Sequence, residues 1–346
     1  MFGPGPQSPG GMYRFATIVD EARRPELSVR IVSTYADNAY RRLPVFLSSL
    51  WAACRLNPAG DLVAHVNVAA GGSTVRKYLL VCVLKWRKVP VVLHLHASSY
   101  REFLDSLSPR LIARVSKFFS MAGMVVVLGS DSAEMVTTQL GVDSSKVAVV
   151  PNGVPGPESV PVRSASGGLS LLFAGELSER KGVPDLIKAL ARIEPGVDWA
   201  MVIAGGGDIP ALKAEIGGLG MADRIDLPGW IDQQALHGYR SSADVFVLPS
   251  YREGLPLAVL EAMAYGMAVI TTPVGNIGDL IDDGVNGLLV QPGDQAGLAA
   301  AIGRLAGDRL LLAALGKAAR ETWVESYSEN AMIDSLEDVW RATLGQ

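Results

Sequence analysis

Cysteine is scarce in this chain of 346 residues, where Cys54 and Cys82 are the two examples and both lie in apolar stretches. Two thiols exclude a disulfide framework and cannot hold a zinc ion alone. Apolar runs as long as the roughly 20 residues of a membrane-spanning helix are absent. The first residues also lack the basic and apolar regions of a signal peptide. The sequence therefore predicts a cytoplasmic chain that does not cross a membrane.

A strong net charge is absent too, because 31 basic and 35 acidic residues leave a formal charge of −4. This balance argues against nucleic acid as the main partner. The charges are unevenly placed, however: residues 1–150 carry a net charge of +7 and residues 151–346 a net charge of −11. Such polarity predicts two domains that face different partners.

Strand-like apolar runs alternate with helical patterns, which predicts an α/β fold of two doubly wound, Rossmann-like domains. A segment rich in Pro, Gly and Ser over 151–168 interrupts the alternation and marks a boundary. We expect the following parts: an N-terminal domain over 1–155, a linker over 156–168, a C-terminal domain over 169–325 and a final helix over 326–346. Ligands of such folds bind where the strands end.

The expected first strand is missing from the pattern. A Gly-rich turn at Gly10 and Gly11, leading into a helix, normally follows a buried strand. Only a few residues, mostly Pro and Gly, precede it here. Either the first strand is absent, or the chain begins later than the natural gene product.

The segment 250–266 contains the residues that most clearly indicate a ligand-binding site. Pro256 suits the first position of a helix, and Gly266 suits its C-terminal cap. The backbone N–H groups of Leu257 and Ala258 would then lie unpaired at the positive end of that helix. Such a helix end is suited to binding phosphate.

Two carboxylates flank this predicted phosphate site. Glu253 precedes the helix, and Glu261 lies about one and a half turns inside it. One carboxylate can contact a sugar, and the other can accept hydrogen bonds from ribose hydroxyls. A surface loop with two solvated acids is an alternative, and so is the acid/base pair of a glycosidase. The adjoining phosphate site disfavours hydrolysis.

Together, several motifs resemble those of retaining glycosyltransferases of family 4, which have the GT-B fold, and in particular bacterial polysaccharide and exopolysaccharide members. Glu253 to Glu261 resembles the E-x7-E motif, and residues 173–182 resemble the G-R-L-x-x-x-K-G donor loop. Four further segments fall in the family's order and spacing, so that the resemblance covers nearly the whole chain: 150–154, 205–208, 227–231 and 279–286.

The resemblance implies roles for residues of the second domain. Lys181 matches the lysine that neutralises the donor diphosphate, and Glu261 matches the residue that binds the ribose. Glu253 matches the carboxylate beside the transferred sugar. The amides that follow it, at Gly254, Leu255 and the helix start, hold phosphate and sugar oxygens.

Further positions carry over in the same way. Gly11 matches a first-domain glycine whose backbone approaches the diphosphate, and Ile231 falls where backbone groups meet the base. His94 and His96 alternate on a predicted strand and share a face. His96 matches the family histidine near the donor sugar and the acceptor hydroxyl, whereas we expect His94 to be structural. The final helix would cross back to the first domain, with Trp340 as a docking contact.

One position departs from the family pattern. The arginine usual after the glycine of the donor loop is Glu176 here, and an acidic side chain repels a pyrophosphate. Three interpretations stay open: Arg180 turns inward and compensates, Glu176 points away, or activity is weak or lost.

The resemblance implies a retaining transferase that needs no metal or other cofactor. It would move a hexosyl group from a UDP- or GDP-linked sugar to a saccharide or lipid-linked acceptor. One alternative is a non-catalytic nucleotide-sugar binder or scaffold, motivated by Glu176 and the missing strand. Another is a GT-B isomerase or phosphorylase, which would need acid/base groups that we do not find.

The basic first domain suggests peripheral contact with an anionic membrane at its inner face. Lys and Arg residues flank or interleave apolar residues in two predicted helices, and basic amphipathic helices can lie on anionic surfaces. The alternative is that each helix turns its apolar face to the core and its charges to water. The residues concerned are Arg76, Lys77, Lys85, Arg87, Lys88, Arg110, Arg114 and Lys117.

Overall fold

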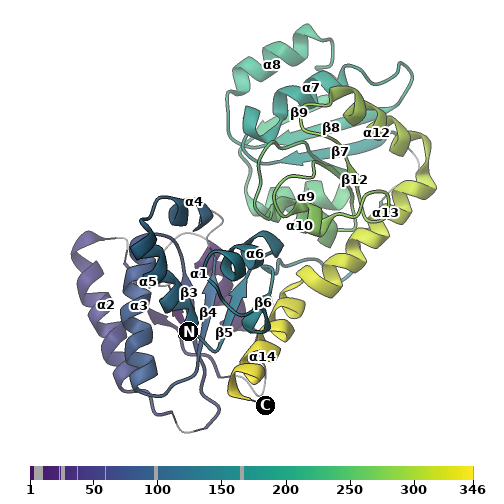
Figure 1. Ribbon diagram of the computed structural model, residues 1–346. Helices are drawn as coiled ribbons and strands as arrows, with labels where there is room; N and C mark the ends of the chain where they lie inside the picture. The colour runs from purple at the N-terminus through teal and green to yellow at the C-terminus, as the bar shows by residue number, and fades with distance from the viewer. Residues whose placement is uncertain are drawn as a thin grey trace. The chain divides into compact units, whose positions relative to one another are not determined.

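The structure of the chain is a computed structural model that describes residues 1–3, 11–22, 24, 28–36, 38–58, 60–96, 100–163 and 167–345. The chain divides into two compact units (Figure 1). Unit 1 comprises Met1–Gly153 with Glu329–Gln346, and unit 2 comprises Val154–Ser328. No helix of the described ranges is both long enough and apolar enough to span a membrane.

Unit 1 is built on a six-stranded parallel sheet of order β2-β1-β3-β4-β5-β6. The order reverses direction between β1 and β3, and ligands of such sheets bind at the strand ends beside this switch point. The strands are β1 (Phe2–Gly3), β2 (Val32–Ser33), β3 (Ala64–Val68), β4 (Val91–Leu95), β5 (Met124–Val127) and β6 (Val147–Val149).

The expectation of a missing first strand is wrong. Phe2 and Gly3 form β1, which pairs in parallel with β2, and Phe2 also pairs with Val66 of β3. The Phe2 side chain is buried in the core. Two residues are too few to show a strand periodicity, so the sequence pattern could not reveal this element.

Helices cover both faces of this sheet, because alternate strand residues point to opposite sides. Leu93 and Leu95 pack under α2–α6, whereas Val92 and Val126 pack under α1 and the C-terminal helix α14. The helices are α1 (Gly11–Glu21), α2 (Ala39–Cys54), α3 (Gly72–Trp86), α4 (Tyr100–Asp105), α5 (Pro109–Ser120), α6 (Ser130–Thr138) and α14 (Glu329–Leu344), with a 3₁₀ turn η1 (Ser144–Lys146) before β6.

Helix α14 belongs to unit 1 although it ends the chain. It packs on β4 and β5 and buries Met332, Ile333 and Leu336 beside Phe15 of α1. Burial of such a side chain stabilises a fold by about 1.5–3 kcal/mol. The last residues of the chain therefore complete the core of its first unit.

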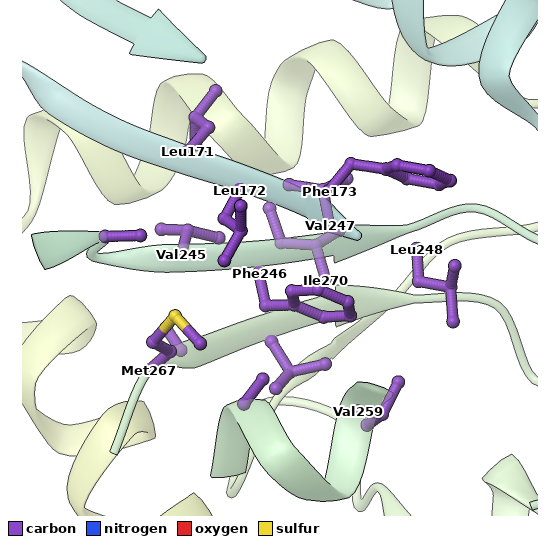
Figure 2. Close-up of a cluster of buried hydrophobic side chains, with 14 of the residues drawn as sticks. Leu171, Leu172, Phe173, Val245, Phe246, Val247, Leu248, Val259, Met267 and Ile270 are labelled. Carbon is purple, nitrogen blue, oxygen red and sulfur yellow. The ribbon is translucent and has the colours of Figure 1, made fainter. Parts of the chain in front are cut away.

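Unit 2 repeats the architecture with the sheet order β12-β11-β10-β7-β8-β9, again parallel throughout. Counted from β7, this is the 3-2-1-4-5-6 order of dinucleotide-binding folds, with its switch point between β7 and β10. The strands are β7 (Leu169–Ala174), β8 (Trp199–Ala204), β9 (Ile225–Gly229), β10 (Val245–Leu248), β11 (Ala268–Thr271) and β12 (Leu288–Leu289). Figure 2 shows the β7, β10 and β11 side chains that form its apolar core, together with Val259 of α10.

The helices of unit 2 follow the strands in alternation, as the sequence predicts for an α/β fold of two doubly wound domains. They are η2 (Glu179–Lys181), α7 (Val183–Leu190), α8 (Ile209–Gly218), α9 (Gln233–Ser242), α10 (Leu257–Ala264), α11 (Ile277–Leu280), α12 (Gln295–Gly307), α13 (Arg309–Thr322) and the π-helical turn η3 (Trp323–Tyr327). The predicted fold class is confirmed.

Candidate functional site

Two loops meet at the switch point of unit 2, one after β7 and one after β10. The Tyr251 N–H donates to the Arg180 carbonyl at 2.9 Å and ties the loops together. Gly182 has a φ of +71°, and a Cβ there would lie 2.0 Å from the Pro249 carbonyl oxygen. Only glycine permits this approach, so the sequence fixes how closely the two loops pack.

Lys181 and Glu253 meet where these loops converge. Lys181 Nζ lies 2.6 Å from Glu253 Oε1, and the Ser250 hydroxyl donates to the same oxygen at 2.7 Å. The side chains are 16% and 7% exposed, respectively. Partial removal from water strengthens a charged hydrogen bond, so the pair is held in place before any ligand arrives.

Glu261 of α10 forms a second ion pair, with Arg240 of α9. Both side chains are buried. Sequence reasoning did not identify Arg240, because an isolated arginine in a helical pattern gives no signal of its partner 21 positions away. The arginine fixes the Glu261 carboxylate in an otherwise apolar helix.

A pocket of about 450 Å³ opens above Glu261. The loops after β7, β8 and β9 and the facing sides of α9 and α10 line it. Three of the predicted site residues, Ile231, Ala258 and Glu261, come together here. The rest of the lining consists of Ala174, Gly175, Glu176, Ala204, Gly205, Gly206, Trp230, Gln233, Leu236 and Arg240.

The floor of this pocket depends on a close backbone approach. Gly205 has a φ of +155°, and a Cβ there would lie 1.6 Å from the Gly175 carbonyl oxygen. The Gly-rich turns after β7 and β8 therefore lie against each other, and any side chain at Gly205 would separate them.

The N-terminus of α10 adds backbone donors to the site. Pro256 is the cap residue rather than the first helical residue, so the helix begins one position later than the sequence predicts. Its extended backbone, with ψ near 110°, excludes it from the helix itself. The amides of Leu257 and Ala258 come before Val259, whose N–H is the first to donate within the helix, to the Pro256 carbonyl at 3.0 Å, and they have no acceptor within the helix. Gly254 and Leu255 are half-buried just before it.

Glu176 and Arg180 form an exposed ion pair across one turn of the donor loop, with 2.8 Å between Arg180 Nη2 and Glu176 Oε2. The hydrogen bond from Arg180 is the main reason that the pKa of Glu176 lies below its ordinary value. Arg180 also donates to the Arg252 carbonyl at 3.3 Å. Glu176 lines the pocket, and the positive charge of Arg180 balances its negative charge.

His96 and Gly11 belong to unit 1. His96 follows β4, its Nε2 lies 3.0 Å from Asn67 Oδ1, and its ring stacks on His94 at 3.9 Å between centroids. The predicted shared face of the two histidines is confirmed. Burial lowers the pKa of His96 from 6.5 to about 3, so the ring is neutral at pH 7. Gly11 is the first residue of α1.

A chain of hydrogen bonds joins Trp340, His65 and His94, the ring on which His96 stacks. Trp340 Nε1 of α14 donates to His65 Nδ1 at 3.0 Å, so a neutral His65 carries its proton on Nε2. That nitrogen lies 3.1 Å from His94 Nδ1, which leaves the His94 proton on Nε2. Burial lowers the pKa of both rings well below the ordinary value. Trp340 therefore fixes the tautomers of two core histidines, and His94 is structural in this sense.

His237 of α9 is exposed, and its Nδ1 lies 2.5 Å from the Tyr265 hydroxyl. Within the described ranges, no group of three or more His, Cys, Asp or Glu side chains is arranged to hold a metal ion.

Comparison with known protein families places both units. Residues 14–155 match the family described as Glycosyltransferase Family 4, and residues 168–308 match the family described as Glycosyl transferases group 1. The two segments do not overlap; the first falls in unit 1 except for its last two residues, and the second falls in unit 2. They include every predicted site residue except Gly11.

Two bacterial glycosyltransferases are similar to parts of the chain. The lipopolysaccharide core biosynthesis glycosyltransferase LpsE of Rhizobium meliloti is 34% identical over 165 residues, which is 48% of this chain and 47% of LpsE. The putative colanic acid biosynthesis glycosyltransferase WcaL of Escherichia coli is 27% identical over 304 residues, 82% of this chain and 71% of WcaL. The chain spans less than half of the length of several curated relatives that it matches, as it does for LpsE.

A solved structure agrees over the whole chain. Anabaena HepE in complex with UDP has a TM-score of 0.72 at 16% identity and covers 97% of this chain and 98% of HepE. At this identity the likeness establishes the fold. The chain thus has the GT-B fold, with one segment that matches Glycosyltransferase Family 4 and a second that matches Glycosyl transferases group 1, and bacterial polysaccharide glycosyltransferases are among its relatives.

Proposed function

We propose that the chain is a retaining, metal-independent glycosyltransferase of family 4 that moves a hexosyl group from a UDP- or GDP-linked sugar to a saccharide or lipid-linked acceptor. The observation that carries this proposal is the pocket at the switch point of unit 2, which combines the buried Glu261 carboxylate with the N-terminal turn of α10 at Ala258. The neighbour HepE binds UDP, and another of its structures holds UDP-glucose.

The pocket has the chemistry to hold a nucleoside. The Glu261 carboxylate, which Arg240 orients, is suited to accept hydrogen bonds from two ribose hydroxyls. Ile231 lines the same pocket as Glu261, and its backbone groups are the partners we assign to the base. Backbone recognition of the base leaves room for either uracil or guanine.

Positive charge for the diphosphate comes from Lys181 and from the N-terminus of α10. An aligned helix end attracts anions, and its first amides donate directly to phosphate oxygens. Lys181 adds a full charge at the leaving group, where negative charge grows as the sugar departs. In this proposal these groups take the place of a divalent cation. Arg180 adds further positive charge at the diphosphate when a bound ligand displaces it from its ion pair with Glu176.

Glu253, Gly254 and Leu255 are assigned to the transferred sugar. Because Lys181 and Ser250 hold the Glu253 carboxylate, its position is set before the donor binds. We assign the neutral His96 ring to hydrogen bonds with hydroxyls of the donor sugar and the acceptor, and the backbone of Gly11 to the diphosphate side. In a retaining transfer, the acceptor attacks the sugar face that the phosphate leaves, and the departing phosphate takes the acceptor proton.

The acceptor side is assigned to unit 1. Its basic composition supports peripheral contact with an anionic membrane at the cytoplasmic face, where lipid-linked acceptors reside. Nucleic acid is not among the proposed partners.

A non-catalytic nucleotide-sugar binder is the second candidate, because Glu176 stands in the pocket lining at the position where the motif has arginine. A screen of UDP-, GDP-, ADP- and dTDP-sugars with simple saccharide acceptors, in buffer containing EDTA, tests both candidates. Release of one nucleotide, with the anomeric configuration retained in the product by NMR, is the expected result. Donor binding without any nucleotide release would support the binder instead, and release that requires a divalent cation would contradict metal independence.

A further inference from the structure

Helix α2 of unit 1 exposes an apolar stripe that no other described residue of its unit covers. Residues 43–54 contain no charged side chain, although one flank of the helix faces solvent. Phe46, Ser49 and Ala53 form the buried side. The opposite side exposes residues at helical spacing: Tyr40 (93% exposed), Leu43 (64%), Leu47 (52%) and Trp51 (62%). A solvent-facing helix normally carries charge on this side.

The stripe continues on the neighbouring helices. Helix α3 packs beside α2, and α5 packs beside α3 (Figure 1). Trp86 is 71% exposed at the end of α3, and Val75, Leu79 and Leu111 extend the apolar surface. An apolar groove of about 600 Å³ lies between α3, α4 and α5, with Arg114 and Lys117 among its lining. We call these exposed surfaces of α2, α3 and α5 the α2–α3–α5 face.

The charges of the face have one sign. Helices α2, α3 and α5 contain no Asp or Glu. The guanidinium of Arg55 lies over the Trp51 ring at 4.5 Å, and that of Arg87 lies over the Trp86 ring at 5.6 Å. The exposed cations on or beside these helices are Arg41, Arg42, Arg55, Lys85, Lys88, Arg110, Arg114 and Lys117.

The structure also corrects one member of the predicted basic surface. Lys77 is buried, and its ammonium donates to the Thr34 hydroxyl. Burial lowers its pKa from 10.5 to about 7. Lys77 therefore belongs to the interior of unit 1 and not to the face.

We infer that the α2–α3–α5 face docks on an anionic lipid bilayer, with the α2 stripe and Trp86 inserted at the level of the headgroups and the surrounding cations on the lipid phosphates. Tryptophan beside arginine suits this interface, because the rings prefer the boundary region and the cations the anionic surface. A second copy of the chain would instead bring one all-cationic face onto another, which like charges oppose.

The inference rests on the proposed function, since it supplies the surface by which a lipid-linked acceptor would be reached. Its test needs no transferase activity. If vesicle binding fails while donor binding persists, the docking surface is wrong and the donor site stands. If donor binding fails while vesicle binding persists, the reverse holds.

The test is co-sedimentation of the full chain with phosphatidylcholine vesicles that contain or lack about 30% phosphatidylglycerol. We expect sedimentation with the anionic vesicles and a loss of roughly tenfold in affinity between about 0.05 M and 0.5 M salt. Leu47→Glu and Trp51→Glu, both at exposed positions, should each weaken binding at least roughly tenfold. Leu310→Glu on α13 is the matched control, because Leu310 is 85% exposed in unit 2, and it should leave binding unchanged.

Tryptophan fluorescence gives a second readout. Brominated lipids in the anionic vesicles should quench the wild-type chain, and Trp51→Phe and Trp86→Phe should each remove part of that quenching. Three results would overturn the inference. They are equal binding to both kinds of vesicle, unaltered binding of Leu47→Glu and Trp51→Glu, and a lipid-free dimer in sedimentation velocity that Leu47→Glu dissociates.

Discussion

Lys181 Nζ lies 2.6 Å from Glu253 Oε1, where the loops after β7 and β10 converge. The two residues are 72 positions apart in the chain and stand on opposite sides of the switch point of unit 2. The pair is held between two strand ends and the N-terminus of α10. One side chain is suited to a phosphate and the other to a sugar hydroxyl, which is the division of labour that a diphosphate sugar requires.

Replacement of Lys181 by Ala should weaken nucleotide-diphosphate binding by about 10- to 100-fold, since a charged hydrogen bond contributes about 1.5–3 kcal/mol. Competition against a fluorescent nucleotide measures the change. Lys188→Ala, at an exposed position on α7, provides the control with the same loss of charge. Equal affinities of the two variants would remove Lys181 from the donor site.

Glu261→Gln should keep the shape of the pocket but lose the carboxylate. We expect nucleoside affinity to fall by roughly tenfold, because a neutral amide is a weaker acceptor for ribose hydroxyls. Both Glu261→Gln and Arg240→Met leave one charge of the buried pair without its partner and so destabilise the fold, Arg240→Met by about 3–5 kcal/mol. Chemical unfolding and ligand titration separate the two effects. A Gln variant with unaltered affinity would argue against Glu261 as the ribose ligand.

Glu176→Arg should strengthen donor binding several-fold, because it replaces a negative charge in the pocket lining with a positive one beside the diphosphate. Glu179→Arg makes the same charge change three residues along and serves as the control. Tighter binding confined to position 176 would show that the native glutamate limits donor affinity. Weaker binding at this position would show that the Glu176–Arg180 pair is itself part of the site.

The stability of the chain should fall as the pH drops below about 6.5. His65, His94 and His96 take up protons near that pH when unfolded, whereas burial lowers the pKa of all three in the folded chain, that of His96 to about 3. The unfolded state then binds more protons, so the free energy of unfolding decreases by up to about 1.4 kcal/mol per pH unit for each histidine. Above pH 6.5 this contribution is fully present.

Urea unfolding at several pH values measures this slope. His94→Phe removes one of the three buried imidazoles and should lower the pH dependence of the free energy of unfolding by the contribution of one histidine. A wild-type free energy that stays constant from pH 7.5 to about 5 would contradict the account.

The sequence predicts much of the fold because parallel strands buried on both faces appear as continuous apolar runs, as in β4 and β10. The spacing of Glu253 and Glu261 likewise predicts that both lie near one helix start, as they do. Local patterns miss what depends on distant chain segments. β1 has only two residues, which are too few to show the alternation of a strand. The position of Pro256 outside the helix follows from its backbone angles, which the sequence does not give.

Tertiary contacts explain the remaining differences. Arg240 of α9 becomes a site residue only because its side chain contacts Glu261 of α10, and no sequence motif predicts that ion pair. The basic residues around Lys77 in the sequence predict that it is a surface cation. In the structure it is buried in unit 1 and donates a hydrogen bond to Thr34. The apolar stripe of α2 is equally invisible, because a helix pattern does not state which face the rest of the unit covers.

The most direct measurement is a calorimetric titration of UDP and GDP, with EDTA present, into the wild-type chain and into the Lys181→Ala/Glu261→Gln double variant. We expect one of the two nucleotides to bind the wild-type chain at a single site, and the double variant, still folded by its melting transition, to lose this binding. Failure of both nucleotides to bind the wild-type chain, or equal binding by the double variant, would contradict a donor site in the unit 2 pocket.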